Sequence, residues 1–266
     1  MRISFVHAGD ASWASYRYRA SRPAAALGAS LNDLTADVLV FCKPVEALVQ
    51  MAMTLKASGR TIIVDICDAH RDRPTYPALT AIANAVTCAT PMMAAWLRSQ
   101  QPCAQITVIP DAYEFEECPP HAAGRRLLWF GHQANYPCLE RVLPTLTGMT
   151  LDVVTNRPGA TPWSLPNLRA AFARADLVIL PMSDPRKSAN RAIEAIRQGC
   201  GVVAEPHPAL EHIPGVWLGN IAEGIHARTP RQVNADTARA QDWIRPRFSM
   251  EACAAKWRDV CLGVPA

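Results

Sequence analysis

Four polar side chains in the C-terminal half are spaced so that they could bind a phosphorylated ligand. They are Lys187, Asn190, Arg191 and Glu194. Their spacing of i, i+3, i+4 and i+7 places them on one stripe of a helix. Cations near the start of this helix, with the dipole and free N–H groups of its N-terminus, could bind a diphosphate. Ser188 can begin the helix, and Glu194 could accept hydrogen bonds from two ribose hydroxyls. The alternative is a solvated helix face on which a cation pairs with Glu194.

A second group of polar residues follows the first predicted strand, residues 3–6. Gly9 could let the backbone approach a ligand there. Tyr16, Arg17 and Arg19 open the next predicted helix. These side chains either lie in solvent or line a wall that binds donor phosphate or an anionic acceptor, and the sequence leaves both interpretations open.

A third polar cluster, which contains Asp68 and His70, follows the predicted strand 61–66. Either side chain could orient or deprotonate an acceptor hydroxyl. Loop capping is the alternative, because Asp and His often bond nearby backbone groups.

Strands and helices that alternate along the chain must position these residues. Short apolar runs that lack polar alternation predict parallel strands covered on both faces. The predicted strands are 3–6, 37–41, 61–66, 85–88, 106–109, 126–130, 150–154, 176–180, 201–204 and 216–218. Helices are predicted between them, among them 16–30, 188–198 and a last helix over 248–262 with Ser249 as its cap.

The strand–helix pattern occurs twice, which predicts an α/β fold with two Rossmann-like, doubly wound parallel sheets. The break at residues 111–125 is acidic and aperiodic, as expected of an interdomain linker. The predicted domains are 1–124 on the acceptor side, 125–245 on the donor side, and a C-terminal helix, 246–266, that packs back towards the first domain. Ligands bind beyond the carboxyl ends of such strands, so we expect the site in a cleft across which the two domains face each other.

The composition limits the possible functions. The formal net charge is +4, with 10 Lys and Arg against 11 Asp and Glu in residues 1–124 and 17 against 12 in residues 125–266. The C-terminal half is thus the basic one, which suits an anionic ligand without requiring nucleic acid. No apolar run is long enough to span a membrane, and the N-terminus lacks a signal-peptide pattern. Nine cysteines without a CxxC pair indicate buried free thiols and a cytoplasmic location.

The stretch 175–204, ADLVILP…KSANRAIEAIRQGCGVVA, resembles the C-terminal donor motif of retaining GT-B glycosyltransferases of the family-four type, also called glycosyl transferases group 1. Weaker likenesses support it. ITVIPDAYEF resembles the end of the family's N-terminal domain, with Asp111 in place of the usual Asn. LLWFGHQAN resembles its first donor strand and loop, and FSMEACAAKW its closing helix. The resemblance touches most of the chain.

The resemblance implies roles for individual residues. Lys187 and the turn Ser188–Arg191 would meet the donor diphosphate, and Glu194 would hold the ribose. Gly131 and His132 would approach the phosphates from the other side. One departure is Arg186, which stands where many members carry a further glutamate.

The resemblance also implies an activity: transfer of a hexosyl or pentosyl group from a nucleoside-diphosphate sugar to a hydroxyl acceptor, with retention of configuration. No cofactor and no obligatory metal are expected, since no DxD-like pair ends a strand and no GxGxxG loop is present. A saccharide or lipid-linked glycan is the expected acceptor. The alternatives are a hydroxymethylated base in DNA, a non-catalytic nucleotide-binding partner subunit, and a sugar-nucleotide epimerase.

Overall fold

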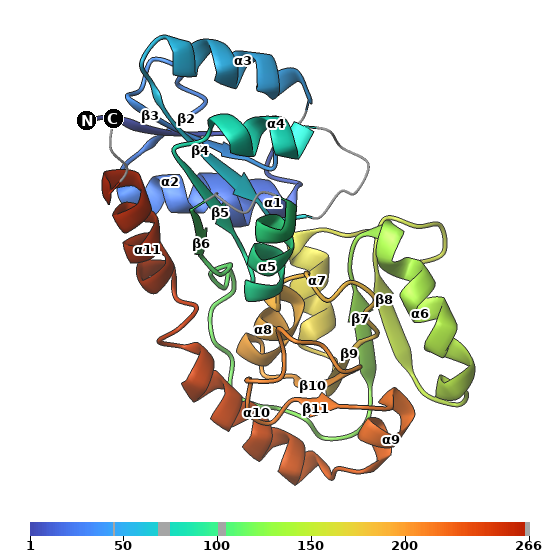
Figure 1. Cartoon of the computed structure of the whole chain (residues 1–266). Coiled ribbons are helices and arrows are strands. Elements are labelled where there is room, and N and C mark those ends of the chain that lie inside the picture. The colour runs from blue at the N-terminus through green and yellow to red at the C-terminus, as the bar shows by residue number, and fades with distance from the viewer. Residues whose placement is uncertain (45, 69–74, 101–104, 264–266) are drawn as a thin grey trace. The chain divides into compact units, whose positions relative to one another are not determined.

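The computed structural model describes residues 1–44, 46–68, 75–100 and 105–263. The chain forms two compact units (Figure 1). Unit 1 comprises Met1–Ala112, Arg186–Ser188 and Phe248–Ala266, and unit 2 comprises Tyr113–Pro185 and Ala189–Arg247. Unit 1 is therefore assembled from three separate stretches of the chain. The domain boundaries predicted at residues 124 and 245 stay predictions.

The sheet of unit 1 has six parallel strands in the order β2-β1-β3-β4-β5-β6. The strands are β1 (Ile3–Val6), β2 (Ser30–Leu31), β3 (Val38–Cys42), β4 (Thr61–Ile66), β5 (Ala85–Cys88) and β6 (Ile106–Val108). Every residue of β3, β4 and β5 is buried. This burial on both faces explains why these strands are apolar along nearly their whole length.

Helices cover both faces of this sheet. They are α1 (Ala14–Tyr16), the π-helix η1 (Arg17–Ser21), α2 (Arg22–Leu27), α3 (Glu46–Ala57), α4 (Thr75–Ile82), α5 (Pro91–Gln100) and α11 (Met250–Gly263). Leu39 of β3 lies in one buried cluster with residues of α3, α4 and α5. Its neighbour Val40 points to the opposite face, where Ala24 of α2 and Trp257 of α11 pack with Phe5.

Unit 2 contains a five-stranded parallel sheet in the order β11-β10-β9-β7-β8. Its strands are β7 (Leu127–Phe130), β8 (Leu151–Val154), β9 (Leu177–Leu180), β10 (Gly201–Ala204) and β11 (Trp217–Leu218). Its helices are η2 (Gln133–Asn135), α6 (Tyr136–Val142), η3 (Leu143–Leu146), α7 (Leu165–Phe172), α8 (Asn190–Arg197), α9 (Ile221–His226) and α10 (Pro230–Ile244). The prediction of two parallel-sheet α/β units is confirmed.

Two details of the helices test the sequence analysis. The first helical stretch ends at Leu27 rather than at residue 30, because Gly28 adopts the left-handed conformation (φ 64°) that terminates a helix. The residues beyond it form the edge strand β2, which the sequence analysis did not predict. The predicted cap of the last helix is confirmed, since the Ser249 Oγ accepts a hydrogen bond from the Ala252 N–H at 3.1 Å.

Candidate functional site

The carboxyl edge of the unit 2 sheet contains a topological switch point. From β7 the chain adds β8 on one side and then crosses to add β9 on the other. Ligands of open parallel sheets bind at such a reversal of strand order. The loop after β7 contains Gly131 and His132, and the segment after β9 leads to α8. Two of the predicted donor-binding elements, the loop after β7 and the segment that leads to α8, therefore begin at one edge of one sheet.

Arg191 lies in the first turn of α8 and reaches this edge. Its Nη1 donates a hydrogen bond to the carbonyl of Phe130, the last residue of β7, at 3.3 Å. A Cβ added at Gly131 would lie 3.4 Å from the same nitrogen, so the loop passes close to the guanidinium. The structure thus brings together two of the predicted residues, Gly131 and Arg191.

The charge of Arg191 has no carboxylate partner among the described residues. Its side chain is half-buried, and the loss of water around the guanidinium lowers its pKa to about 10. A buried cation without a counter-charge is costly unless something else supplies the charge. This guanidinium is therefore a candidate anion-binding group.

Arg191 belongs to the first turn of α8, so the N-terminus of this helix lies at the same place. Its N-cap residue, Ala189, has no side chain able to accept a hydrogen bond from the first turn. Asn190 satisfies one amide of that turn, since its Oδ1 accepts from the Arg191 N–H at 2.8 Å. The helix dipole adds to the positive potential at this position.

His132 has a local structural contact. Its Nδ1 accepts a hydrogen bond from the Ala134 N–H at 3.2 Å, which caps the short helix η2. Its predicted contact with phosphate stays a prediction, although its neighbour Gly131 lies at the switch point.

Glu194 is placed differently from what a ribose contact requires. Its side chain is 2% exposed, and its carboxylate accepts hydrogen bonds from the N–H groups of Glu114 at 2.6 Å and Phe115 at 3.1 Å. Glu194 therefore holds the chain segment that begins unit 2. Ribose binding by Glu194 stays a prediction, and this placement does not support it.

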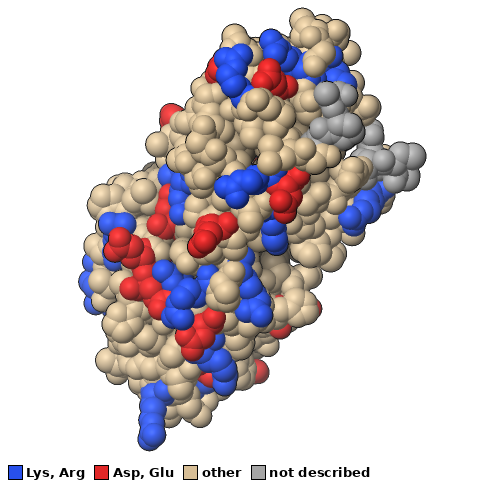
Figure 2. Space-filling view, turned by 90° about the vertical axis from the view of Figure 1, so that its left-hand side faces the viewer, with Lys and Arg blue, Asp and Glu red and all other residues tan. Residues whose placement is uncertain are grey.

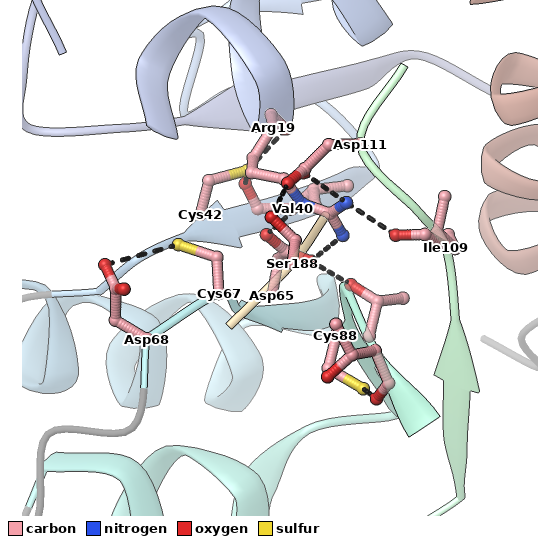
Figure 3. A network of polar contacts seen from close by, with 12 residues as sticks. Arg19, Val40, Cys42, Asp65, Cys67, Asp68, Cys88, Ile109, Asp111 and Ser188 are labelled. Atoms are coloured by element: carbon pink, nitrogen blue, oxygen red, sulfur yellow. Dashed lines mark hydrogen bonds and ion pairs between the residues drawn. The ribbon is translucent and has the colours of Figure 1, made fainter. Parts of the chain in front are cut away.

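The core of unit 1 contains a buried ionic network (Figure 3). The Arg19 guanidinium, 1% exposed, donates to both carboxylate oxygens of Asp65 at 2.6 and 2.9 Å. It also donates to the Ile109 carbonyl at 2.6 Å and to Asp111 at 3.2 Å. Burial alone would lower the pKa of Arg19, but Asp65 and Asp111 outweigh it and raise that pKa well above its usual value. The prediction that Arg19 binds an acceptor gains no support from this placement.

The tripeptide Arg186–Ser188 joins unit 1 through this network. The Ser188 hydroxyl donates to Asp111 at 2.6 Å, and the Thr90 hydroxyl donates to the Arg186 carbonyl at 2.9 Å. The Asp111 carboxylate thus holds Ser188 within unit 1. Asp111 is a residue whose role the sequence analysis missed.

Lys187 pairs with Asp68 within unit 1. Asp68 also pairs with Lys43, whose Nζ lies 2.8 Å from its Oδ2. Burial alone would raise the pKa of Asp68, but the two ammonium groups outweigh it and hold that pKa well below its usual range. So weak a base is poorly suited to deprotonate a hydroxyl near neutral pH. The other predicted catalytic residue of this loop, His70, lies outside the described residues.

The residues after β1 form the other polar edge of unit 1. The His7 Nδ1 accepts a hydrogen bond from the Gly9 N–H at 2.8 Å, and its ring stacks edge-on against Tyr16 at 5.5 Å. Burial, and secondly the charge of Lys43, lower the pKa of His7. Arg17 is 7% exposed and donates to the Ala11 carbonyl at 2.8 Å. The donor contact predicted for Gly9 and the acceptor contacts predicted for Tyr16 and Arg17 stay predictions.

Two absences concern the described residues alone. None of their helices has the length and hydrophobicity needed to span a lipid bilayer. No group of three or more His, Cys, Asp or Glu side chains among them could hold a metal ion.

Two parallel-sheet α/β units of this kind define a GT-B-like fold, and solved structures share it over nearly the whole chain. HepE of Anabaena in complex with UDP has a TM-score of 0.74 at 14% identity, over 99% of this chain and 100% of that one. BGT of phage T4 in complex with its UDP-glucose substrate has a TM-score of 0.62 at 10% identity, over 98% and 99%.

A third structure is a variant of S. aureus TarM in complex with fondaparinux, α-GlcNAc-glycerol and UDP. It has a TM-score of 0.65 at 12% identity, over 84% of this chain and 55% of that one, so this chain matches about half the length of TarM. No family model matches the sequence, and no curated protein matches it. At these identities the structures establish the fold.

Proposed function

We propose that this chain is a glycosyltransferase that takes a sugar from a nucleoside-diphosphate sugar and transfers it to a hydroxyl acceptor. The observation that carries the proposal is Arg191, a half-buried guanidinium without a described carboxylate partner at the switch point of a parallel sheet. The N-terminus of α8 and the close backbone of Gly131 complete a site suited to a diphosphate. The UDP and UDP-glucose complexes of proteins with the same fold support this choice of ligand.

The proposed reaction builds negative charge on the leaving nucleoside diphosphate. The bond between the sugar's anomeric carbon and the distal phosphate oxygen breaks, the acceptor oxygen forms the new glycosidic bond, and the acceptor's proton passes to the departing phosphate oxygen. Arg191 and the α8 N-terminus stabilise the diphosphate as its charge grows. Lys187 pairs with Asp68 in unit 1, and its contact with the diphosphate, which the family resemblance implies, is part of this proposal. Retention of configuration, which the family resemblance implies, is part of this proposal.

The proposed acceptor is a saccharide or a lipid-linked glycan. Asp68 serves better as a hydrogen-bond acceptor that orients the hydroxyl than as its base, because its pKa is low. We place the reaction in the cytoplasm, which the eight described free cysteines support.

Nucleotide binding is the first test. Calorimetric titration with UDP, GDP, ADP, CDP and dTDP identifies the base, and Arg191→Met should weaken binding of the preferred nucleotide by about tenfold or more, since it removes a charged hydrogen bond. Arg231→Met is the matched control, because it removes an exposed arginine of α10 in the same unit. Equal affinities of wild type and Arg191→Met would remove the basis of the proposal.

Product analysis with the matching nucleotide sugar is the second test. Transfer to an acceptor, with the configuration read by NMR, supports a retaining transferase. Nucleotide binding without turnover on any acceptor would indicate a non-catalytic subunit, and an isomerised nucleotide sugar without acceptor would indicate an epimerase.

A hydroxymethylated base in DNA is a second candidate acceptor, which the charge of unit 1 favours. Unit 1 contains 14 Lys and Arg against 10 Asp and Glu. A protein of the same fold is a DNA-modifying β-glucosyltransferase. On the face drawn in Figure 2, however, basic and acidic side chains are interspersed, which favours the saccharide. If the protein binds to a DNA column and this binding weakens steeply as the salt concentration rises, DNA is supported instead, because phosphate contacts release counterions.

A further inference from the structure

Trp13 is an exposed aromatic side chain at the carboxyl edge of the unit 1 sheet. It precedes α1, and 47% of its surface is accessible. The strand order places this edge at the second topological switch point of the protein, since β1 has β2 on one side and β3 on the other. His7 follows β1, and Lys43 follows β3. An indole exposed at such a position is available to a ligand.

The Trp13 ring is held in place by its neighbours. The His7 ring meets it edge-on at 6.1 Å, and the Lys43 Nζ lies 5.6 Å from its centroid. A Cβ at Gly9 would come within 2.8 Å of the indole Cδ2, so only glycine allows the backbone to pass there. Because its conformation is already fixed, the ring loses little entropy when it binds a ligand.

The lysine over this ring carries a paired carboxylate. Lys43 is 21% and Asp68 is 18% exposed, and they form an ion pair at 2.8 Å. Lys43 also has a positive φ of 46°, a conformation that is unfavourable for lysine and that the surrounding structure must stabilise. Its amide donates to the Asp65 carbonyl at 2.9 Å, which fixes the end of β3. The lysine is thus held in an unfavourable conformation next to the indole.

The Trp13 indole, the Lys43 ammonium and the Asp68 carboxylate together match the chemistry of a sugar ring. A pyranose has an apolar C–H face, which packs on an aromatic ring, and a rim of hydroxyls, which both donate and accept hydrogen bonds. The Lys43 ammonium supplies donors and the Asp68 carboxylate supplies acceptors. We propose that Trp13, Lys43 and Asp68 bind a sugar ring of the acceptor, with Trp13 as its stacking platform. That the bound sugar is part of the acceptor rests on the proposed function, whereas the binding of a sugar by these three residues does not.

A nucleobase would also stack on an indole, but the charges beside the ring favour a sugar. Asp68 is shared by Lys43 and Lys187, so the cluster keeps one positive charge, but the Asp68 carboxylate lies 2.8 Å from the Lys43 ammonium and repels a phosphate placed there. A neutral ring with several hydroxyls uses both partners of this ion pair.

Fluorine NMR of protein labelled with 5-fluorotryptophan tests the proposal. The chain has seven tryptophans, and Trp13→Phe assigns the Trp13 resonance. Methyl glycosides of glucose, galactose, mannose and N-acetylglucosamine are titrated to about 50 mM, a range suited to millimolar affinities. We expect at least one of them to shift the Trp13 resonance and no other, and Lys43→Met to reduce that affinity about fivefold or more.

Trp243 is the matched control. It is half-buried and also has a cation over its ring, Arg247 at 4.6 Å, but it belongs to α10 of unit 2. Trp243→Phe should leave the sugar-dependent shift unchanged. A Trp13 resonance that no glycoside moves would overturn the proposal, and so would a shift caused by a DNA oligonucleotide but by no sugar, or one that Lys43→Met leaves intact.

The proposed function fails separately. The proposed glycosyltransferase function is contradicted if calorimetric titration detects no binding of any nucleoside diphosphate, a test that concerns the site at Arg191 in unit 2. The sugar site of unit 1 is judged by the Trp13 resonance, with or without nucleotide.

Discussion

The two units carry polar clusters at the same edge of their sheets, but they balance charge differently. In unit 1 the buried Arg19 is matched by Asp65 and Asp111, and Asp68 is matched by two lysines. In unit 2 the half-buried Arg191 has a backbone carbonyl as its hydrogen-bond partner and no described carboxylate. Paired charges can hold the fold without a ligand, whereas an unpaired cation is satisfied only when an anion arrives. The contrast separates charges that serve stability from a charge that serves binding.

The distribution of net charge follows the same division. Unit 1 carries 14 Lys and Arg against 10 Asp and Glu, whereas unit 2 carries 13 of each. The sequence analysis assigned the positive excess to the C-terminal half. That assignment changes because Arg186 and Lys187 belong to unit 1. In addition, Glu114, Glu116 and Glu117 belong to unit 2. The neutrality of unit 2 makes Arg191 a local feature rather than part of a basic surface.

The largest expected effect is that of Asp65→Ala. It leaves the buried Arg19 guanidinium with Asp111 as its one described carboxylate partner, at 3.2 Å, so the free energy of unfolding should fall by about 3–5 kcal/mol, as measured by urea denaturation. Replacing both partners, as Arg19→Met with Asp65→Leu, should recover part of the loss, because neither charge of this pair then remains and Asp111 keeps its hydrogen bond from Ser188. A loss below about 1 kcal/mol in the single variant would contradict the view that this pair holds unit 1 together.

Glu194→Ala should have the next largest effect. The carboxylate accepts two backbone hydrogen bonds, so its removal should lower the free energy of unfolding by about 1.5–3 kcal/mol. Glu223→Ala, which removes an exposed glutamate of α9, is the control. If Glu194 also holds the ribose, nucleotide affinity falls together with stability. A variant with full stability and weakened nucleotide binding would show that Glu194 serves the ligand alone.

Asp68→Asn tests the paired cluster through its pH dependence. The pKa of Asp68 is lowered in the folded protein, so its ion pairs contribute stability above the usual value of 3.8, and this contribution is lost as the pH falls through the folded pKa. The difference in melting temperature between wild type and Asp68→Asn should therefore stay constant from pH 7 to about pH 4 and shrink progressively from there down to pH 2.5. The difference at neutral pH should be about 1 kcal/mol or less, because both lysines are partly exposed. Parallel curves down to the lowest pH would contradict the direction of the shift.

The smallest expected effect on stability is that of Arg191→Met. Because the guanidinium has no carboxylate partner, its replacement should leave the free energy of unfolding within about 1 kcal/mol of wild type, or raise it slightly. This outcome contrasts with the large loss expected for Arg19→Met alone. If Arg19→Met and Arg191→Met lower the free energy of unfolding by the same amount in one denaturation series, then Arg191 stabilises the fold as Arg19 does.

Much of the fold could be predicted because its strands are apolar nearly end to end, as in β3 and β9, and burial on both faces leaves that pattern in the sequence. The short edge strand β2 was missed, since two residues after a helix-ending glycine carry no periodicity. The domain boundaries drawn from the proline-containing, acidic stretch stay predictions, and no sequence signal indicated that Arg186–Ser188 groups with unit 1.

The site was predictable in part. The helical spacing of the four polar residues placed Arg191 correctly near the start of α8, because such spacing depends on local sequence alone. It did not predict that Lys187 turns to Asp68 or Glu194 to the amides near residue 114, since both partners are far away in sequence. Lys43 and Trp13 were missed for the same reason. The one available signal was the rarity of lysine, of which the chain has four: Lys43, Lys56, Lys187 and Lys256.

The closing helix α11 has a consequence for folding. Trp257 lies in the same buried cluster as Phe5 and meets its ring at 5.3 Å, so this face of the unit 1 sheet is covered by a helix that is far from it in sequence. Unit 2 lies between Phe5 and Trp257 along the chain, interrupted only by Arg186–Ser188. Because loop closure over so many residues costs entropy before the contact forms, we expect this face of unit 1 to be covered late in folding.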